Sequence, residues 1–221
     1  SLIQDGVSAA RPLPTDTSLS HLYHLTGDVL LLGDRGAGKT TLLLELLLEL
    51  LTCAEQQEDE PIPVVFPLAS WSGKPSSLAE WLVEVLNKDY FMSRKVAQTW
   101  VETDRLIVLL DGLDKVPEEL RQACVKAIDA YQNAHPEVPL VVCSQTEAYF
   151  AQPFRLRFSQ AVQVQSLTRA QINLYLDDAC KEPPLYQALL EDHDLLEMCA
   201  NPFILSLMVE LANEGEASAA F

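Results

Sequence analysis

Short apolar runs alternate along the chain with longer stretches in which apolar residues recur every three or four positions. The run Leu106–Leu110, for example, contains no polar residue and predicts a strand that is covered on both faces. Runs of comparable length predict strands over 28–33, 63–68, 106–110, 139–144 and 161–165. Helical spacing between them predicts helices over 39–54, 77–87, 93–103 and 117–134. Strands that alternate with helices in this way predict a parallel sheet wrapped by helices.

The strand pattern stops near residue 166, and only helical signals follow it. Thr168 and Gln171 have the spacing of a capping box, which predicts a helix over 168–180. Further helices are expected over 184–191, 194–200 and 203–213. Residues 1–20 are rich in Pro, Ser, Thr and Asp, as is typical of a linker or an arm. The predicted organisation is an arm over 1–20, an α/β domain over 21–166 and a helical subdomain over 167–221.

The first predicted strand leads directly into a glycine-rich loop. Residues 33–40 read GDRGAGKT and fit the pattern G-x-x-x-x-G-K-[ST] at each fixed position. The alternative is a chance glycine turn before a core helix, but a strand precedes the loop and a long Leu-rich helix follows it, as the pattern requires. Small residues let successive backbone N–H groups surround phosphates, and the helix N-terminus adds partial positive charge. The sequence therefore predicts a binding site for a nucleoside triphosphate.

Three side chains are expected to act on the triphosphate and its metal ion. Lys39 is expected to reach the β- and γ-phosphates, and the Thr40 hydroxyl to bind Mg²⁺. Mg²⁺ also needs a carboxylate from the end of a neighbouring strand, and Asp111 directly follows the apolar run 106–110. The alternative for Asp111 is a turn, since Asp-Gly pairs are common in turns. The expected phosphate-binding residues are Gly33, Asp34, Arg35, Gly36, Ala37, Gly38, Lys39, Thr40 and Thr41.

The catalytic group and the nucleotide base are less sharply defined. Asp114 lies three residues beyond Asp111 and is the candidate for orienting or polarising an attacking water. ATP or ADP is the expected ligand, and GTP is not excluded. A small GTPase would carry N-K-x-D after its fourth strand, whereas the similar text Asn87–Tyr90 precedes Asp111 and has Tyr in the place of Asp. The sequence therefore disfavours a GTPase of that class.

The composition argues against two kinds of partner. The formal net charge is −17 and Lys and Arg do not cluster, which disfavours a nucleic-acid surface. The longest apolar run, 42–51, is broken by Glu45 and Glu49 and is too short to cross a bilayer. The five Cys residues are widely spaced, without a C-x-x-C pair, as expected for reduced thiols. The sequence thus predicts a cytoplasmic protein that binds neither nucleic acid nor membranes.

The glycine-rich segment GDRGAGKTT and the acidic segment LLDGLDKV at 109–116 together resemble the NACHT family of signal-transduction NTPases. The resemblance covers nearly the whole chain, including PIPVVFPLASW, PLVVCSQ and ANPFILSLM, and is strongest to bacterial NACHT modules of STAND proteins. It implies a five-stranded parallel P-loop NTPase sheet of the ASCE type, followed by a small helical subdomain. It further implies an ATP- or GTP-driven switch, closed with diphosphate and open and oligomeric with triphosphate. Pro202 would contact the nucleotide base, although proline is also common in the first turn of a helix.

Two positions depart from the family pattern. The family usually has Glu after the second Asp of the acidic motif, where this chain has Lys115, and Ser-Arg where this chain has Ser144-Gln145. A protonated lysine cannot act as a base, and Lys115 would lie near the phosphates and Mg²⁺. Gln145 lacks the charge that would sense a γ-phosphate. One hypothesis is that the two changes compensate, with Lys115 partly supplying the cation that Gln145 lacks. We expect nucleotide binding with slow or absent hydrolysis, because loss of a positioned base typically costs about 10²–10⁴-fold in rate.

Three functions remain open on the sequence. The leading one is a regulatory nucleotide-binding switch module of a larger signal-transduction or defence protein. The second is an active ATPase that uses Asp114 as its base, and the third is a degenerate scaffold that binds no nucleotide. The resemblance also implies further domains in the same chain, a winged helix and a repeat sensor, and a homo-oligomer in the activated full-length state. Because the chain starts at Ser1 without Met, we expect a domain excised from a longer protein.

Overall fold

The computed structural model describes residues 2–3, 13, 17–56, 60–75, 77–158, 160–179 and 192–219. The chain divides into two compact units. Unit 1 comprises Ser1–Asp34 and Lys39–Gln163, and unit 2 comprises Arg35–Gly38 and Val164–Phe221.

Unit 1 is built on a six-stranded sheet in the order β1-β6-β2-β5-β4-β3. Five strands run parallel to one another: β2 (Val29–Gly33), β3 (Ile62–Pro67), β4 (Leu106–Asp111), β5 (Leu140–Gln145) and β6 (Ala161–Gln163). The sixth, β1 (Leu2–Ile3), falls within the segment predicted to be an arm and pairs antiparallel with the edge of β6. The predicted five-stranded parallel sheet is therefore confirmed, with one short strand added at its edge.

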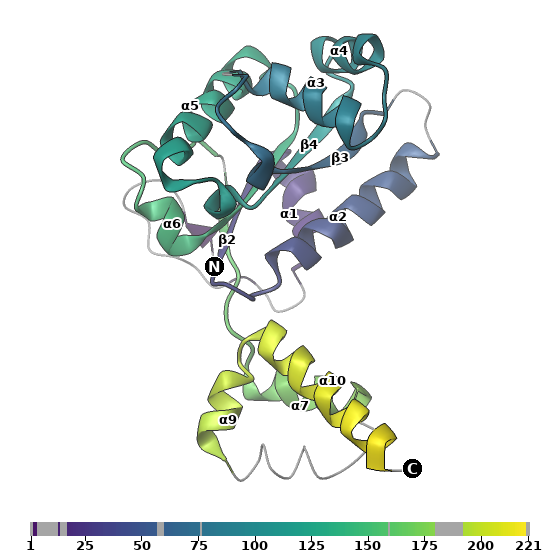
Figure 1. Cartoon of the computed structure of the whole chain (residues 1–221), viewed down its shortest axis with the longest axis vertical. Coiled ribbons are helices and arrows are strands. Elements are labelled where there is room, and N and C mark those ends of the chain that lie inside the picture. The colour runs from purple at the N-terminus through teal and green to yellow at the C-terminus, as the bar shows by residue number, and fades with distance from the viewer. Residues whose placement is uncertain are drawn as a thin grey trace. The chain divides into compact units, whose positions relative to one another are not determined.

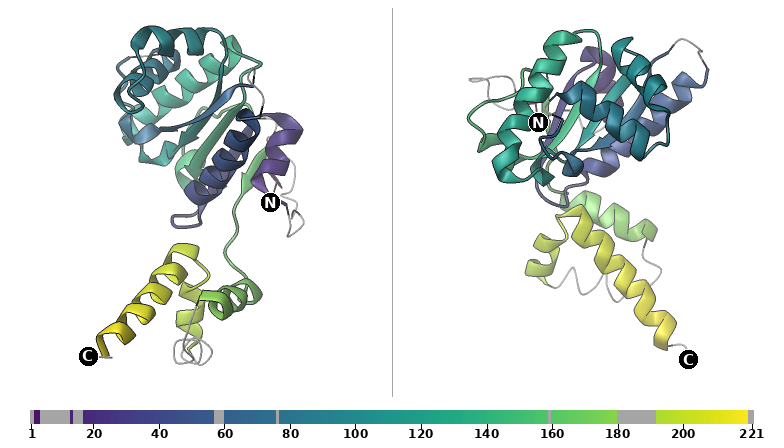
Figure 2. Two further views of the ribbon diagram at one scale, coloured as in Figure 1. Left: turned by 90° about the vertical axis from the view of Figure 1, so that its right-hand side faces the viewer. Right: turned by 45° about the horizontal axis from the view of Figure 1, so that its top comes forward.

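Helices cover both faces of this sheet (Figures 1 and 2). One face carries α1 (Leu19–Thr26) and α2 (Lys39–Ala54). The other carries α3 (Leu78–Lys88) and α5 (Glu118–Ala134), and α4 (Arg94–Glu102) packs on α3. Three short elements complete the unit: η1 (Leu68–Ser70), η2 (Leu113–Lys115) and α6 (Thr146–Phe150).

The ends of these helices follow from local chemistry. Ser77 accepts a hydrogen bond from the backbone N–H of Glu80 (3.3 Å), which satisfies one of the unpaired donors at the start of α3. Helix α1 begins with the same device, since Ser18 accepts a bond from His21, and ends at Gly27 in the left-handed conformation. The sequence pattern did not predict α1, because the helix has only eight residues.

The core of unit 1 explains why the strands read as continuous apolar runs. All six residues of β4 are buried, so neither face of this strand, which lies between β5 and β3, meets water. Next to the sheet, Trp71 and Trp81 pack edge to face with ring centroids 5.6 Å apart. Such a core holds the carboxyl ends of the strands in fixed positions, and the candidate site is built there.

Unit 2 contains α7 (Arg169–Ala179), α9 (His193–Met198) and α10 (Pro202–Ala219) (Figure 1). The predicted capping box is present: the Thr168 N–H donates to Gln171 Oε1 (2.9 Å), and the Gln171 N–H donates to Thr168 Oγ1 (3.3 Å). The buried apolar core of the unit consists of Ile172, Leu176, Cys199, Leu205 and Val209. The helix predicted over 184–191 lies outside the described residues.

The same unit includes the tip of the glycine-rich loop, Arg35–Gly38. The Asn201 side-chain amide donates to the carbonyl of Arg35 (2.7 Å), and the Phe203 N–H donates to the carbonyl of Gly36 (3.2 Å). Pro202, predicted to contact the nucleotide base, lies between Asn201 and Phe203 in the sequence and is the first residue of α10.

Within the part of the chain that the structure describes, none of the helices combines the length and the apolar character needed to cross a bilayer.

Candidate nucleotide-binding site

The glycine-rich loop joins the end of β2 to the start of α2. Gly36 and Gly38 have φ angles of 78° and 87°, a left-handed conformation that side chains with a Cβ rarely adopt. The ammonium of Lys39 donates to the carbonyls of Gly33 (3.0 Å) and Asp34 (2.8 Å). A positive charge is thus held against the backbone at the start of the loop, where the motif places phosphate-binding groups.

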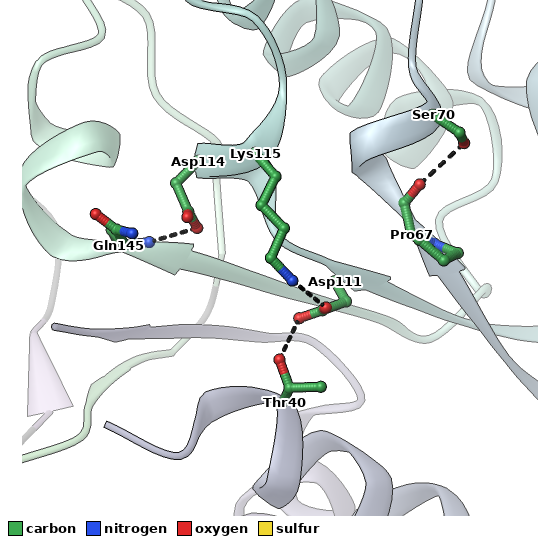
Figure 3. Close-up of polar contacts among 7 residues, drawn as sticks. All are labelled: Thr40, Pro67, Ser70, Asp111, Asp114, Lys115 and Gln145. Atoms are coloured by element: carbon green, nitrogen blue, oxygen red, sulfur yellow. Dashed lines mark hydrogen bonds and ion pairs between the residues drawn. The ribbon is translucent and has the colours of Figure 1, made fainter. Parts of the chain in front are cut away.

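The two predicted metal ligands meet at the carboxyl ends of the strands. Asp111 is the last residue of β4 and is 8% exposed, and Thr40 is the second residue of α2. The Thr40 hydroxyl donates to Asp111 Oδ1 at 3.1 Å (Figure 3). The structure therefore brings together two residues that lie 71 positions apart in the sequence.

The donor set fits Mg²⁺. Hydroxyl and carboxylate oxygens are the ligands that this cation prefers, and Mg²⁺ typically takes only one or two carboxylates, with water and phosphate completing its shell. Among the described residues, no group of three or more His, Cys, Asp or Glu is arranged to hold a metal ion. The ammonium of Lys115 also contacts Asp111.

Lys115, expected near the phosphates and Mg²⁺, contacts the predicted metal ligand Asp111. Its Nζ lies 2.8 Å from Asp111 Oδ2, so that the two oxygens of one carboxylate bond to Lys115 and Thr40 (Figure 3). The Asp111 side chain is 11% exposed and that of Lys115 is 50% exposed. Hydrogen bonding to Asp111 raises the pKa of Lys115 above its usual 10.5, so the amine stays charged at neutral pH. The hypothesis that Lys115 partly supplies the cation that Gln145 lacks stays a prediction, and the observed partner of the ammonium is Asp111.

The side chain of Asp114, the predicted catalytic residue, accepts a hydrogen bond from the backbone. It lies in η2, and its Oδ1 accepts the N–H of Gln145 at 2.9 Å (Figure 3). Arg121 fixes the same turn, because its guanidinium donates to the carbonyls of Asp114 (2.9 Å) and Val116 (3.0 Å). Asp114 therefore ties the turn after β4 to the end of β5.

Two further predicted residues, Gln145 and Thr41, lie near the ends of β5 and α2. Gln145 is the last residue of β5 and is paired in register with Gly33 of β2. Thr41 follows Thr40 in α2 and is exposed. Sequence reasoning passed over Thr146, whose buried hydroxyl has no hydrogen-bond partner among the described residues, although its place next to Gln145 was a usable signal.

The fold and the site define a class of protein. A glycine-rich loop follows β2, an aspartate ends β4, and β5 lies between these two strands in a parallel sheet, which is the arrangement of a P-loop NTPase. A family model for the NACHT domain matches residues 28–183. The chain belongs to the NACHT-domain family, whose members bind nucleotide together with Mg²⁺.

Comparison with one solved structure supports the fold. The chain is similar to the Orc1 protein of Aeropyrum pernix, solved in complex with DNA, with a TM-score of 0.52 and 17% identity over 86% of this chain and 55% of that one. It is also similar to PCH-2 of C. elegans, with a TM-score of 0.42 and 16% identity over 76% of this chain and 42% of that one. The chain thus spans about half the length of the structures that it matches. A search of curated protein sequences found no match.

Proposed function

We propose that this chain is the nucleotide-binding switch module of a larger signal-transduction protein, that it binds ATP or ADP with Mg²⁺, and that it hydrolyses ATP slowly. The observation that carries the proposal is the contact between the Thr40 hydroxyl and Asp111 Oδ1 (3.1 Å). This contact joins the end of the phosphate-binding loop to the strand-end carboxylate, the two parts that P-loop NTPases use together.

Each group has a distinct part in binding. Lys39 supplies positive charge to the phosphates, and Thr40 and Asp111 would hold Mg²⁺. Mg²⁺ would neutralise charge on the phosphate oxygens. The base of the nucleotide is adenine in this proposal, with Pro202 as the residue expected to contact it.

Slow hydrolysis follows from the groups around Asp111. The position after Asp114 carries Lys115, whose charged amine accepts no proton. Gln145, at the end of β5, carries no charge that would stabilise a developing negative charge on the γ-phosphate. Both changes lower the rate of cleavage while leaving the glycine-rich loop intact.

A second candidate is an active ATPase. Only Oδ1 of Asp114 has a hydrogen-bond partner in the described part of the chain, so the second oxygen of this carboxylate is available to polarise a water.

The remaining parts of the proposal concern the longer protein: flanking winged-helix and sensor domains, and a homo-oligomer formed when the triphosphate is bound.

Thermal unfolding and phosphate release, measured together, separate these functions. The purified chain is heated with ATP, ADP or GTP in the presence of Mg²⁺, and phosphate release from each triphosphate is followed in parallel. Under the proposal, adenine nucleotides raise the midpoint of unfolding, because a ligand that binds only the folded state stabilises it by about 2.7 kcal/mol at a hundred times its Kd. Little phosphate is released. Lys39→Ala serves as the control and removes the shift.

Each other outcome selects a different function. Release at the rate of ordinary ATPases selects the second candidate. A larger shift with GTP than with ATP overturns the choice of adenine. No shift with any nucleotide contradicts nucleotide binding and leaves a scaffold.

A further inference from the structure

Lys115 and Asp111 form an ion pair at the position where the fold places a divalent cation. The Nζ of Lys115 is 2.8 Å from Asp111 Oδ2, and Thr40 binds the other oxygen of the same carboxylate (Figure 3). We propose that the ammonium of Lys115 is a built-in cation that can take over the charge-neutralising part of Mg²⁺, so that this site binds nucleotide with similar affinity whether or not Mg²⁺ is present. This inference rests on the proposed nucleotide binding and concerns the charge that supports it.

The turn after β4 is shaped to bring this amine back onto Asp111. Gly112 has a φ of 79°, and the Lys115 N–H donates to its carbonyl at 2.9 Å, which closes the turn η2. A Cβ on Gly112 would lie 2.6 Å from Cδ and 2.9 Å from Cε of Lys115. The side chain of Lys115 therefore runs through space that any residue other than glycine would fill.

Charge balance at the site supports a cation at this position. Lys39 and Lys115 carry positive charges, and Asp111 and Asp114 carry negative charges, so that these four groups sum to zero. A glutamate at position 115, which the resemblance leads one to expect, would make the sum −2. Relative to such a glutamate, Lys115 differs by two positive charges, as many as one Mg²⁺ ion carries.

The two lysines have separate partners. Lys39 is held by the carbonyls of Gly33 and Asp34, and Lys115 is held by Asp111. One cation is therefore placed in the phosphate-binding loop and the other on the metal-binding carboxylate, where ammonium and Mg²⁺ would compete for the same oxygens. Half of the Lys115 side chain is exposed to solvent.

The test compares nucleotide affinity with and without metal. Fluorescent mant-ADP and mant-GDP are titrated into the 221-residue chain in excess EDTA and in millimolar Mg²⁺. The wild type is compared with Lys115→Met, which keeps the length of the side chain but removes the charge, and with Lys115→Arg, which keeps the charge. Lys126→Met, at an exposed position on α5, is the matched control, and thermal unfolding without nucleotide checks that each variant is folded.

We expect the wild type, Lys115→Arg and Lys126→Met to bind in EDTA within about threefold of their affinity in Mg²⁺. Lys115→Met loses about tenfold or more in EDTA, equivalent to about 1.4 kcal/mol, and regains it in Mg²⁺. Wild type that loses affinity in EDTA as strongly as Lys115→Met overturns this inference and leaves the proposed function intact. Lys115→Met that binds equally well in both conditions does the same. Wild type that binds neither probe in either condition contradicts the proposed function as well.

Discussion

The backbone N–H of Gln145 donates a hydrogen bond to Oδ1 of Asp114 at 2.9 Å. This bond links the turn that follows β4 to the last residue of β5. The carboxylate that sequence reasoning assigned to catalysis is thus also a structural acceptor. The observed acceptor role and the predicted catalytic role are separable, because the amide oxygen of asparagine replaces the acceptor but not the base.

Asp114→Asn and Asp114→Ala are expected to differ in stability. Asparagine keeps an oxygen for the Gln145 N–H, whereas alanine leaves this half-buried donor without its partner. We expect Asp114→Ala to lower the free energy of unfolding by about 1–2 kcal/mol and Asp114→Asn by much less. Urea unfolding of both variants measures this. Equal losses in the two variants would show that the hydrogen bond does not stabilise the turn.

Asp114→Asn also tests the catalytic role. We expect Asp114→Asn to release phosphate at the same slow rate as the wild type, because the proposed slow hydrolysis does not use Asp114 as a base. A loss of about 10²–10⁴-fold in the variant would identify Asp114 as the base and support the second candidate.

Lys39→Met is expected to weaken nucleotide binding about 10–100-fold, which corresponds to the loss of a charge-assisted hydrogen bond to phosphate. The loop itself loses the contacts of Lys39 with the carbonyls of Gly33 and Asp34. Titration with mant-ADP measures the affinity, and Lys126→Met controls for the loss of a positive charge elsewhere in unit 1. Unchanged affinity in Lys39→Met would place the nucleotide away from this loop.

Asp28 gives unit 1 a pH dependence. Its carboxylate is half-buried and accepts bonds from the Leu140 N–H and the Gln132 side chain, both at 3.0 Å. Burial raises the pKa of Asp28 above its usual 3.8, so the folded state holds this proton more tightly than the unfolded chain. Stability from this group is therefore present at low pH and falls as pH rises from the unfolded pKa through the folded one.

Asp28→Asn removes this term, since the amide does not ionise. We expect the difference in unfolding free energy between the wild type and Asp28→Asn to move in favour of the variant as pH rises from about 4 toward neutrality. Urea unfolding across this range measures it, with Asn at the exposed Asp89 as the control. A difference that stays constant or moves the other way would contradict a raised pKa.

The sequence predicted the parts of this fold that depend on local pattern. Buried strands such as β4 read as unbroken apolar runs, and the glycine-rich loop fixed the ends of β2 and α2. The proximity of Thr40 and Asp111 was also predictable, because the carboxyl ends of parallel strands meet at one edge of a sheet.

Other features depend on contacts that no local pattern encodes. Strand β1 has only two residues and exists because β6 offers an unpaired edge. The direction of the Lys115 side chain depends on the left-handed Gly112 and on the position of Asp111. The hydrogen bond between Gln145 and Asp114 could not be predicted, because it depends on β5 lying beside the turn after β4.

The fate of bound ATP tests the central claim most directly, namely that this site holds a nucleotide better than it cleaves it. The chain in excess over radiolabelled ATP, with Mg²⁺, forms the complex, and the conversion of bound ATP to ADP is followed over time. Enzymes typically turn over at about 10 s⁻¹. Loss of a positioned base lowers this rate by about 10²–10⁴-fold, which predicts conversion at about 10⁻¹ to 10⁻³ s⁻¹ or slower. ATP is then retained on the protein. Conversion at about 1–10 s⁻¹ would contradict the account.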